Sequence, residues 1–344
     1  MPHRNLIPVH SSIQNEGCVT RNLGLAFNKR FEQWMFLIIP GSLVLGFLFA
    51  PMLHRFVPAV PYLFAYVTLT MALGCGIGQL RAVIRKPGIM LWTFILAHAA
   101  SPIIAYAVGM LAFGADSPYV IGLVLFTIIP LGVSTVLWVG MSGGSVPLIL
   151  AMVVIDSALS PFVVPAGIHL FFQTDIEIQT GQMIADLLLI IVVPTAIGVL
   201  LHQVTKGRIQ KAVHPYSAPL SKLCFVAVVS LNAAAIEPYL SVLQDDLLLL
   251  VPIAVLMVGL CYAIGFFGTA FMGNRELQVT VSYASGMRNI SLGIVLALGY
   301  FSPLAAVPVV LSILIQQPLA TLHHYVLHKL NNSKAGVKGK GQVR

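Results

Sequence analysis

Residues 119–142 have the sequence YVIGLVLFTIIPLGVSTVLWVGMS. This stretch decides the fold, because its 24 residues carry no formal charge and are long enough to cross a bilayer as a helix. Helix-breaking and polar residues between Pro130 and Thr135 nevertheless interrupt it near the middle. Such a pattern indicates a membrane-spanning helix that is broken at mid-depth, where free backbone groups can contact a substrate or an ion.

The composition of the whole chain agrees with a membrane protein. Of its 344 residues, 58% are apolar and only 9% are charged, and the mean hydropathy is +0.92. An ordinary soluble domain has about 25% charged residues. These values exclude a soluble enzyme, a nucleic-acid-binding domain and a disordered chain, and they predict an all-α polytopic membrane protein.

Ten apolar segments follow one another along the chain. They are continuous rather than alternating, so they predict helices and not the strands of a barrel. The segments cover about residues 34–53, 60–80, 88–113, 119–142, 145–173, 183–202, 218–236, 247–272, 277–299 and 303–328.

The charges predict the orientation of these segments. If the N-terminus is cytoplasmic, every Lys and Arg except Arg55 and Arg288 falls on the cytoplasmic side. Most of the acidic residues fall on the other side or at its edge: Asp116, Asp175, Glu177, Asp186, Glu237, Asp245 and Asp246. An excess of cations inside therefore predicts that both termini are cytoplasmic, in a multi-pass protein of the plasma (inner) membrane.

Five segments in each half of the chain would place the second half upside down relative to the first, as in inverted-repeat transporters. The corresponding fourth and ninth segments are both interrupted, the ninth around Gly286. We therefore expect a cytosolic tail (residues 1–33), a first five-helix repeat (34–173), an external connection (174–182), a second repeat (183–328) and a basic cytosolic tail (329–344).

Two charged residues lie inside the predicted spans. Burying Arg288 near the bilayer centre costs at least about 2.5–3.5 kcal/mol, so we expect this residue to be paired or to line a wet cavity. Asp156 in segment 145–173 would balance it if the fold brings the two segments together. The pair would then be a static salt bridge, or Arg288 would grip a carboxylate of the substrate and Asp156 would carry a coupling proton.

The other polar residues near the breaks allow two interpretations. Ser134, Thr135, Asn289 and Ser291 either cap the backbone of the broken helices or line a substrate site, and both roles are compatible. Gln316 interrupts the last segment and could face the same cavity.

Histidines offer two more candidates. His98 precedes a Ser-Pro pair and is either a satisfied core histidine or a proton relay or substrate contact. His324 and His328 have the spacing of metal ligands, but no third ligand is near them in sequence, so we predict no metal site. Catalytic motifs are absent, and we predict neither an enzyme nor a bound cofactor.

The chain resembles the bile acid:sodium symporter family over about residues 34–328. Three stretches carry the likeness: residues 69–74 (LTMALG) with 79–83 (QLRAV) and 85–87 (RKP), then 130–135 (PLGVST) with 142–148 (SGGSVPL) and 160–161 (SP), and last 286–289 (GMRN) with 292–293 (LG) and 296–297 (LA).

The resemblance implies ten helices in two inverted five-helix repeats. The first, second, sixth and seventh segments would form a panel and the others a core, with the broken fourth and ninth segments crossing near the substrate. It further implies secondary transport of organic anions, such as bile acids, pantoate-like acids or other monocarboxylates, usually together with sodium.

The sequence departs from this family at the positions that usually hold sodium. The family's carboxylate ligand corresponds to Ala284, its Gln ligand to Arg288, and its Ser-Asn pair to Ser134-Thr135. A guanidinium at this place would repel sodium by several kcal/mol. The resulting hypothesis is that Arg288 replaces the sodium charge and Asp156 balances it, in a uniporter, exchanger or proton-coupled carrier. The alternatives are a sodium symporter with relocated ligands and a membrane receptor that does not transport.

Overall fold

The computed structural model describes residues 10–85, 87–172, 179–239 and 246–340. Every element within these ranges is helical, and the β-type pairing found there is an isolated bridge between Leu131 and Arg288. Most of the expected external connection 174–182 and the ends of both expected tails lie outside the described residues. The same holds for Asp175, Glu177 and Asp245.

The first half of the chain forms helices that mostly begin near proline or polar residues and run through the apolar segments. Two of the short elements are a 3-10 helix (η1) and a π-helix (η2). In chain order they are α1 His10–Leu48, α2 Ala50–Leu53, η1 His54–Ala59, α3 Val60–Ala72, α4 Ile77–Ile84, α5 Pro87–Ile95, η2 Leu96–Ala100, α6 Ser101–Phe113, α7 Pro118–Ile128, α8 Thr135–Met141 and α9 Val146–Phe171.

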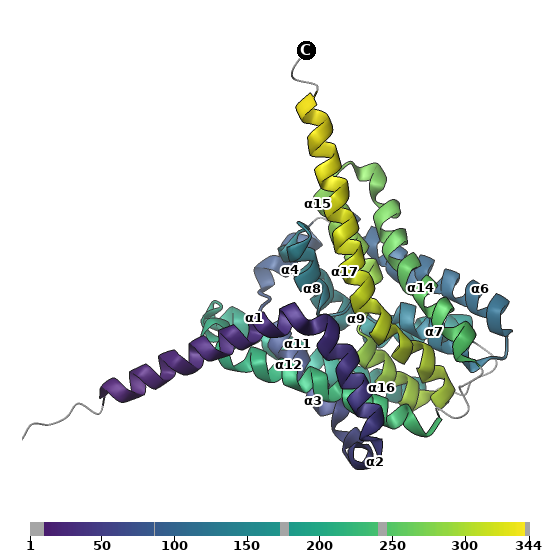
Figure 1. Cartoon of the computed structure of the whole chain (residues 1–344), viewed down its shortest axis with the longest axis horizontal. Coiled ribbons are helices and arrows are strands. Elements are labelled where there is room, and N and C mark those ends of the chain that lie inside the picture. The colour runs from purple at the N-terminus through teal and green to yellow at the C-terminus, as the bar shows by residue number, and fades with distance from the viewer. Residues whose placement is uncertain (1–9, 86, 173–178, 240–245, 341–344) are drawn as a thin grey trace, which may run out of the picture.

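The second half is built in the same way and also contains a π-helix, η3. Its elements are α10 Thr180–Leu187, η3 Leu188–Val192, α11 Val193–Thr205, α12 Arg208–Ile236, η4 Glu237–Tyr239, α14 Leu247–Gly268, η5 Ala270–Met272, α15 Arg275–Gly286, α16 Ile290–Tyr300 and α17 Pro303–Lys340. Figure 1 shows α17 projecting beyond the other helices at its C-terminal end.

Six stretches of the described chain are long and apolar enough to cross a membrane. They are Pro87–Phe113, Val146–Phe171, Thr180–Thr205, Arg208–Ile236, Leu247–Met272 and Pro303–Leu330. The apolar helices α7 and α16 have 11 residues each, because each is one part of a broken segment. The structure therefore shows an all-α protein with several membrane-spanning helices, as the sequence predicts.

Two segments differ from the expected boundaries. The predicted segment 60–80 is interrupted, because the chain leaves the helical path after Ala72 and the Gln79 side chain accepts a hydrogen bond from the Gly76 N–H that starts α4 (2.9 Å). At the N-terminus, α1 begins at His10 and continues through the segment expected to be a tail. The axis of α1 turns by 79° between Leu23–Met35 and Leu37–Leu48.

The helices pack in two groups, which we call the panel and the core. In the panel, α1 packs along α12, α12 along α3, and α3 along α11. In the core, α6 and α17 pack on α7, while α15 and α17 pack on α14 (Figure 1). Glycine permits the closest approaches, since a Cβ at Gly46 of α1 would lie 2.3 Å from a carbonyl oxygen of α12 and a Cβ at Gly122 of α7 would lie 2.2 Å from one of α17.

Candidate functional site

Two broken helices meet backbone to backbone in the core. Helix α7 ends at Ile128, two residues before Pro130, which has no N–H to continue the helix. Helix α15 ends at Gly286, and α16 begins three residues after Met287. The Gly132 N–H donates to the Met287 carbonyl (2.9 Å), and the Asn289 N–H donates to the Pro130 carbonyl (2.8 Å). Both interruptions predicted from the sequence are thus confirmed, and they lie against each other.

Arg288 lies at this junction and is 1% exposed. Its guanidinium donates to the carbonyl of Ala97 (2.7 Å) and to that of Ile129 at the end of α7 (3.4 Å). Carbonyls at a helix C-terminus carry partial negative charge and favour a cation. The Nε atom is buried without a hydrogen-bond partner among the described residues. Backbone oxygens therefore hold the positive charge.

Asp156 of α9 pairs with His98 rather than with Arg288. Its Oδ1 atom lies 2.8 Å from Nε2 of His98, and its Oδ2 atom accepts the Leu131 N–H (2.7 Å). The guanidinium of Arg288 makes no ion pair with Asp156. The sequence left open whether Asp156 and Arg288 pair directly. In the structure they do not, because the π-turn η2 places His98 between α9 and the end of α7, where the histidine pairs with the carboxylate.

A cavity of about 460 Å³ separates the panel from this junction. Five of the predicted site residues line it: Ser134, Arg288, Asn289, Ser291 and Gln316. The hydroxyl of Ser291 is buried and has no hydrogen-bond partner in the described part of the chain. Three predicted residues are not in the wall: Thr135 donates to the Gly132 carbonyl and so caps the break, and His98 and Asp156 pair with each other.

Gln316 and its neighbour on α17 support the cavity floor. The Gln316 side chain accepts the Arg288 N–H (2.8 Å) and donates to the Arg288 carbonyl (3.2 Å), so it fixes the backbone of the second break. Gln317 accepts a hydrogen bond from the indole of Trp138 (3.0 Å). These contacts make Gln316 a positioning residue for Arg288 in addition to a wall residue.

The opposite wall of the cavity belongs to the panel, and none of its residues was predicted as a site residue from the sequence. It combines apolar residues such as Phe64 and Phe225 with polar and charged ones, among them the ion pair of Lys222 with Glu32 (2.7 Å). Aromatic residues of a panel helix have the same sequence signature as lipid-facing ones. Helix α12 begins at Arg208, ten residues before the predicted segment 218–236, and carries Lys222 into the cavity wall.

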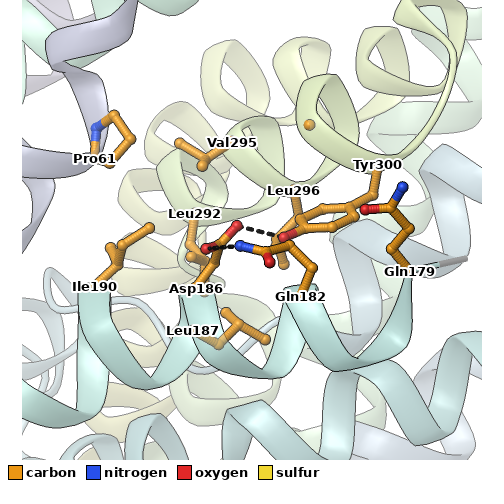
Figure 2. Close-up of a pocket in the computed structure, with 11 residues that line it drawn as sticks. Pro61, Gln179, Gln182, Asp186, Leu187, Ile190, Leu292, Val295, Leu296 and Tyr300 are labelled. Carbon is orange, nitrogen blue, oxygen red and sulfur yellow. Dashed lines mark hydrogen bonds between the residues drawn. The ribbon is translucent and has the colours of Figure 1, made fainter.

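A second cavity, of about 360 Å³, lies between α10 and α16. Figure 2 shows Gln179, Gln182 and Asp186 on one side of it and Tyr300 on the other. The Asp186 carboxylate accepts hydrogen bonds from the Tyr300 hydroxyl and from the Gln182 amide. The contact between Asp186 and Tyr300 joins α10 to α16.

The model of the Sodium Bile acid symporter family matches residues 60–237, which is more than half of the chain. The chain belongs to the Sodium Bile acid symporter family. It is 33% identical to the protein YbaS of Bacillus subtilis over 295 residues, covering 85% of this chain and 96% of YbaS. The identity to the sodium-dependent transporter YocS of the same organism is 25%, over 86% of this chain and 91% of YocS.

A plant relative is more distant. The probable chloroplast sodium/metabolite cotransporter BASS1 of Oryza sativa is 24% identical over 72% of this chain and 60% of its own length. As a member of this symporter family, the chain is an integral membrane transporter and not an enzyme.

Proposed function

We propose that this protein is a secondary transporter of a small organic anion, either bile-acid-like or a monocarboxylate such as a pantoate-like acid. The observation that carries the proposal is Arg288, which lines the 460 Å³ cavity between panel and core while backbone carbonyls hold its buried guanidinium. A positive charge held in a low-dielectric site attracts an anion far more strongly than one in water. The apolar residues of the panel wall, such as Phe64 and Phe225, would accommodate the carbon skeleton.

The proposed architecture is ten spans in two inverted five-helix repeats. It counts α7 with α8 as one broken span and α15 with α16 as another, in addition to α1, α3 and the long apolar stretches. The crossing of the two breaks, one from each half, supports it. In transporters built from such repeats, the substrate binds at the broken helices near the bilayer midplane.

The proposed orientation places both termini in the cytoplasm of a cell whose inner membrane holds the protein. The large cavity extends to Gln210, His214 and Lys222 of α12, which belong to the cation-rich stretch assigned to the cytoplasm. The Asp186–Tyr300 contact lies toward the opposite side. This arrangement supports an inward-open state, with alternating access exposing the same site to the outside.

We propose that Arg288 takes the place of a bound sodium ion. Its guanidinium is surrounded by backbone carbonyl oxygens, which are also ligands for a metal cation, and the position where the family has a carboxylate is the buried Ala284. A second cation beside the guanidinium would be repelled. The transporter would then bind its anion without sodium at this place.

Uptake into proteoliposomes tests the proposal, with labelled taurocholate and labelled pantoate as two probes. We expect at least one of them to enter equally well with a sodium gradient and with choline in place of sodium. Arg288→Gln should reduce this uptake at least about tenfold, because the anion would lose its cationic partner. A tenfold loss of affinity corresponds to about 1.4 kcal/mol. Arg85→Gln, at an exposed arginine, serves as the matched control.

The alternatives give different results. A sodium symporter with relocated ligands, which the names of YocS and BASS1 favour, would transport only with a sodium gradient. A receptor on this fold would bind taurocholate or pantoate without releasing it into the lumen. Uptake that is unchanged in Arg288→Gln would remove Arg288 from the anion site.

A further inference from the structure

The hydrogen bonds around His98 determine how many protons this residue shares with Asp156. Its Nδ1 atom lies 3.2 Å from the carbonyl oxygen of Ile128, and a carbonyl oxygen only accepts. Nδ1 therefore carries a hydrogen. The other ring nitrogen, Nε2, lies 2.8 Å from the Asp156 carboxyl, and a contact between two bare acceptors would be repulsive. One proton consequently lies between Nε2 and Oδ1.

With that proton the pair has no net charge, whichever of the two atoms carries it. The core then keeps the single positive charge of Arg288, which matches a monoanion in the cavity. Without the proton, the pair is negative and cancels the guanidinium. Anion binding at the junction and proton binding at the pair should therefore favour each other, since coupling between two sites is reciprocal.

The pair is also connected to both helix breaks. Asp156 accepts the Leu131 N–H, and Leu131 forms the backbone bridge with Arg288. His98 holds the last carbonyl of α7. The other titratable group near Arg288 is the thiol of Cys261 on α14, which is buried and lacks a full charge of its own at neutral pH. The charge of this cluster is thus decided by Arg288, Asp156 and His98.

We propose that His98 and Asp156 form a proton-binding site whose occupancy is coupled to the anion in the cavity, so that one proton and one anion cross together. This inference rests on the proposed function, because it names the coupling ion of that transporter. The proton enters and leaves as such, and no bond other than N–H or O–H forms or breaks. Electroneutral symport of a monoanion follows from the charge count.

The test uses the full chain in proteoliposomes that contain the pH dye pyranine, with the membrane voltage clamped by potassium and valinomycin. An inward gradient of pantoate, or of taurocholate in a second series, should acidify the lumen as the anion enters. Asp156→Asn and His98→Gln should each lower the acidification at least about tenfold. The matched controls Asp116→Asn and His169→Gln alter exposed residues and should behave like the unmodified protein.

A second measurement does not depend on the choice of anion. In protein labelled with nitrogen-15 at histidine, the His98 signal is assigned by its loss in His98→Gln. We expect Nδ1 to carry a hydrogen and Nε2 to share a proton with Asp156 when the anion is bound. In Asp156→Asn the signal of this shared proton should be absent.

The outcomes separate the two proposals. Anion uptake without acidification would overturn proton coupling and leave the anion transporter intact. If neither anion enters, the proposed function fails for both probes, and the nitrogen-15 measurement alone decides the proton site. A His98 ring that shares no proton with Asp156 would overturn the site even if transport occurs.

Discussion

The backbones of Leu131 and Arg288 form an antiparallel bridge that joins the two broken helices at the centre of the core. Hydrogen bonds from Gly132 and Asn289 flank it, so residues more than 150 positions apart share a short two-stranded pairing. Backbone hydrogen bonds therefore join the two breaks directly at this point.

Gly132→Ala should destabilise the junction. A Cβ at Gly132 would lie 2.8 Å from the Arg288 carbonyl oxygen, which is itself fixed by Gln316, so backbone would have to shift. Overpacking of this kind costs about 1–3 kcal/mol. Thermal unfolding of the detergent-solubilised protein measures the effect. Gly88→Ala has nothing within 4 Å and is the control, and equal melting temperatures for the two variants would contradict the prediction.

Trp138→Phe should also lower stability, for a different reason. The indole N–H donates to the buried Gln317 amide oxygen, and phenylalanine would leave that oxygen without a donor. An unsatisfied buried acceptor costs about 1–3 kcal/mol. Trp34→Phe removes an indole that is 55% exposed and should leave the melting temperature within error. A Trp138→Phe protein as stable as the Trp34→Phe protein would speak against the hydrogen bond.

Tyr300→Phe should favour opening of the side that we propose to be external. The Tyr300 hydroxyl donates to Asp186 across the second cavity, and its loss removes one contact that closes this side (Figure 2). We expect a cysteine placed at Val295, in the wall of that cavity, to react several-fold faster with a membrane-impermeant maleimide. The protein without the added cysteine gives the background rate. Tyr62→Phe, at a residue that is 78% exposed, should not change the reaction rate.

Glu32→Gln should alter anion binding more than stability. The Lys222–Glu32 pair is partly exposed, with 20% and 41% of the two side chains accessible, and such pairs contribute about 0–1 kcal/mol. Removing the carboxylate leaves Lys222 free to attract an anion into the cavity. We expect a lower KM for pantoate or taurocholate uptake, with the difference shrinking as salt is raised. Glu276→Gln, at an exposed residue, is the control; a KM that rises in Glu32→Gln would contradict this view.

The breaks could be predicted from the sequence because they follow local rules. Pro130 has no N–H, and Gly286 is followed by polar residues in an otherwise apolar run, so neither helix can continue unchanged. The burial of Asp156 and Arg288 was equally predictable, since both lie well inside apolar segments. What these rules describe is the path of one helix at a time.

The partner of Asp156 could not be predicted in the same way. Arg288 and His98 were both available, and the choice depends on how η2 turns His98 toward α9. The panel wall could not be predicted for a similar reason. The sequence around Phe64 and Phe225, which line the cavity, is like that around aromatic residues that face lipid. Contacts between helices depend on how each helix is rotated and packed. An apolar segment predicts that a helix is present, but it does not predict its rotation or its neighbours.

The π-helical turn Leu96–Ala100 that carries His98 has a genetic consequence. A π turn holds one residue more than the regular helix around it. A deletion of one codon there, such as that of Ala99, removes the extra residue, so that the segment continues as an ordinary helix and no longer turns His98 toward α9. We expect such a deletion to keep membrane insertion while His98 loses Asp156 and the proton flux falls. A single in-frame deletion could therefore turn a proton-dependent carrier into an uncoupled one without any substitution at the anion site.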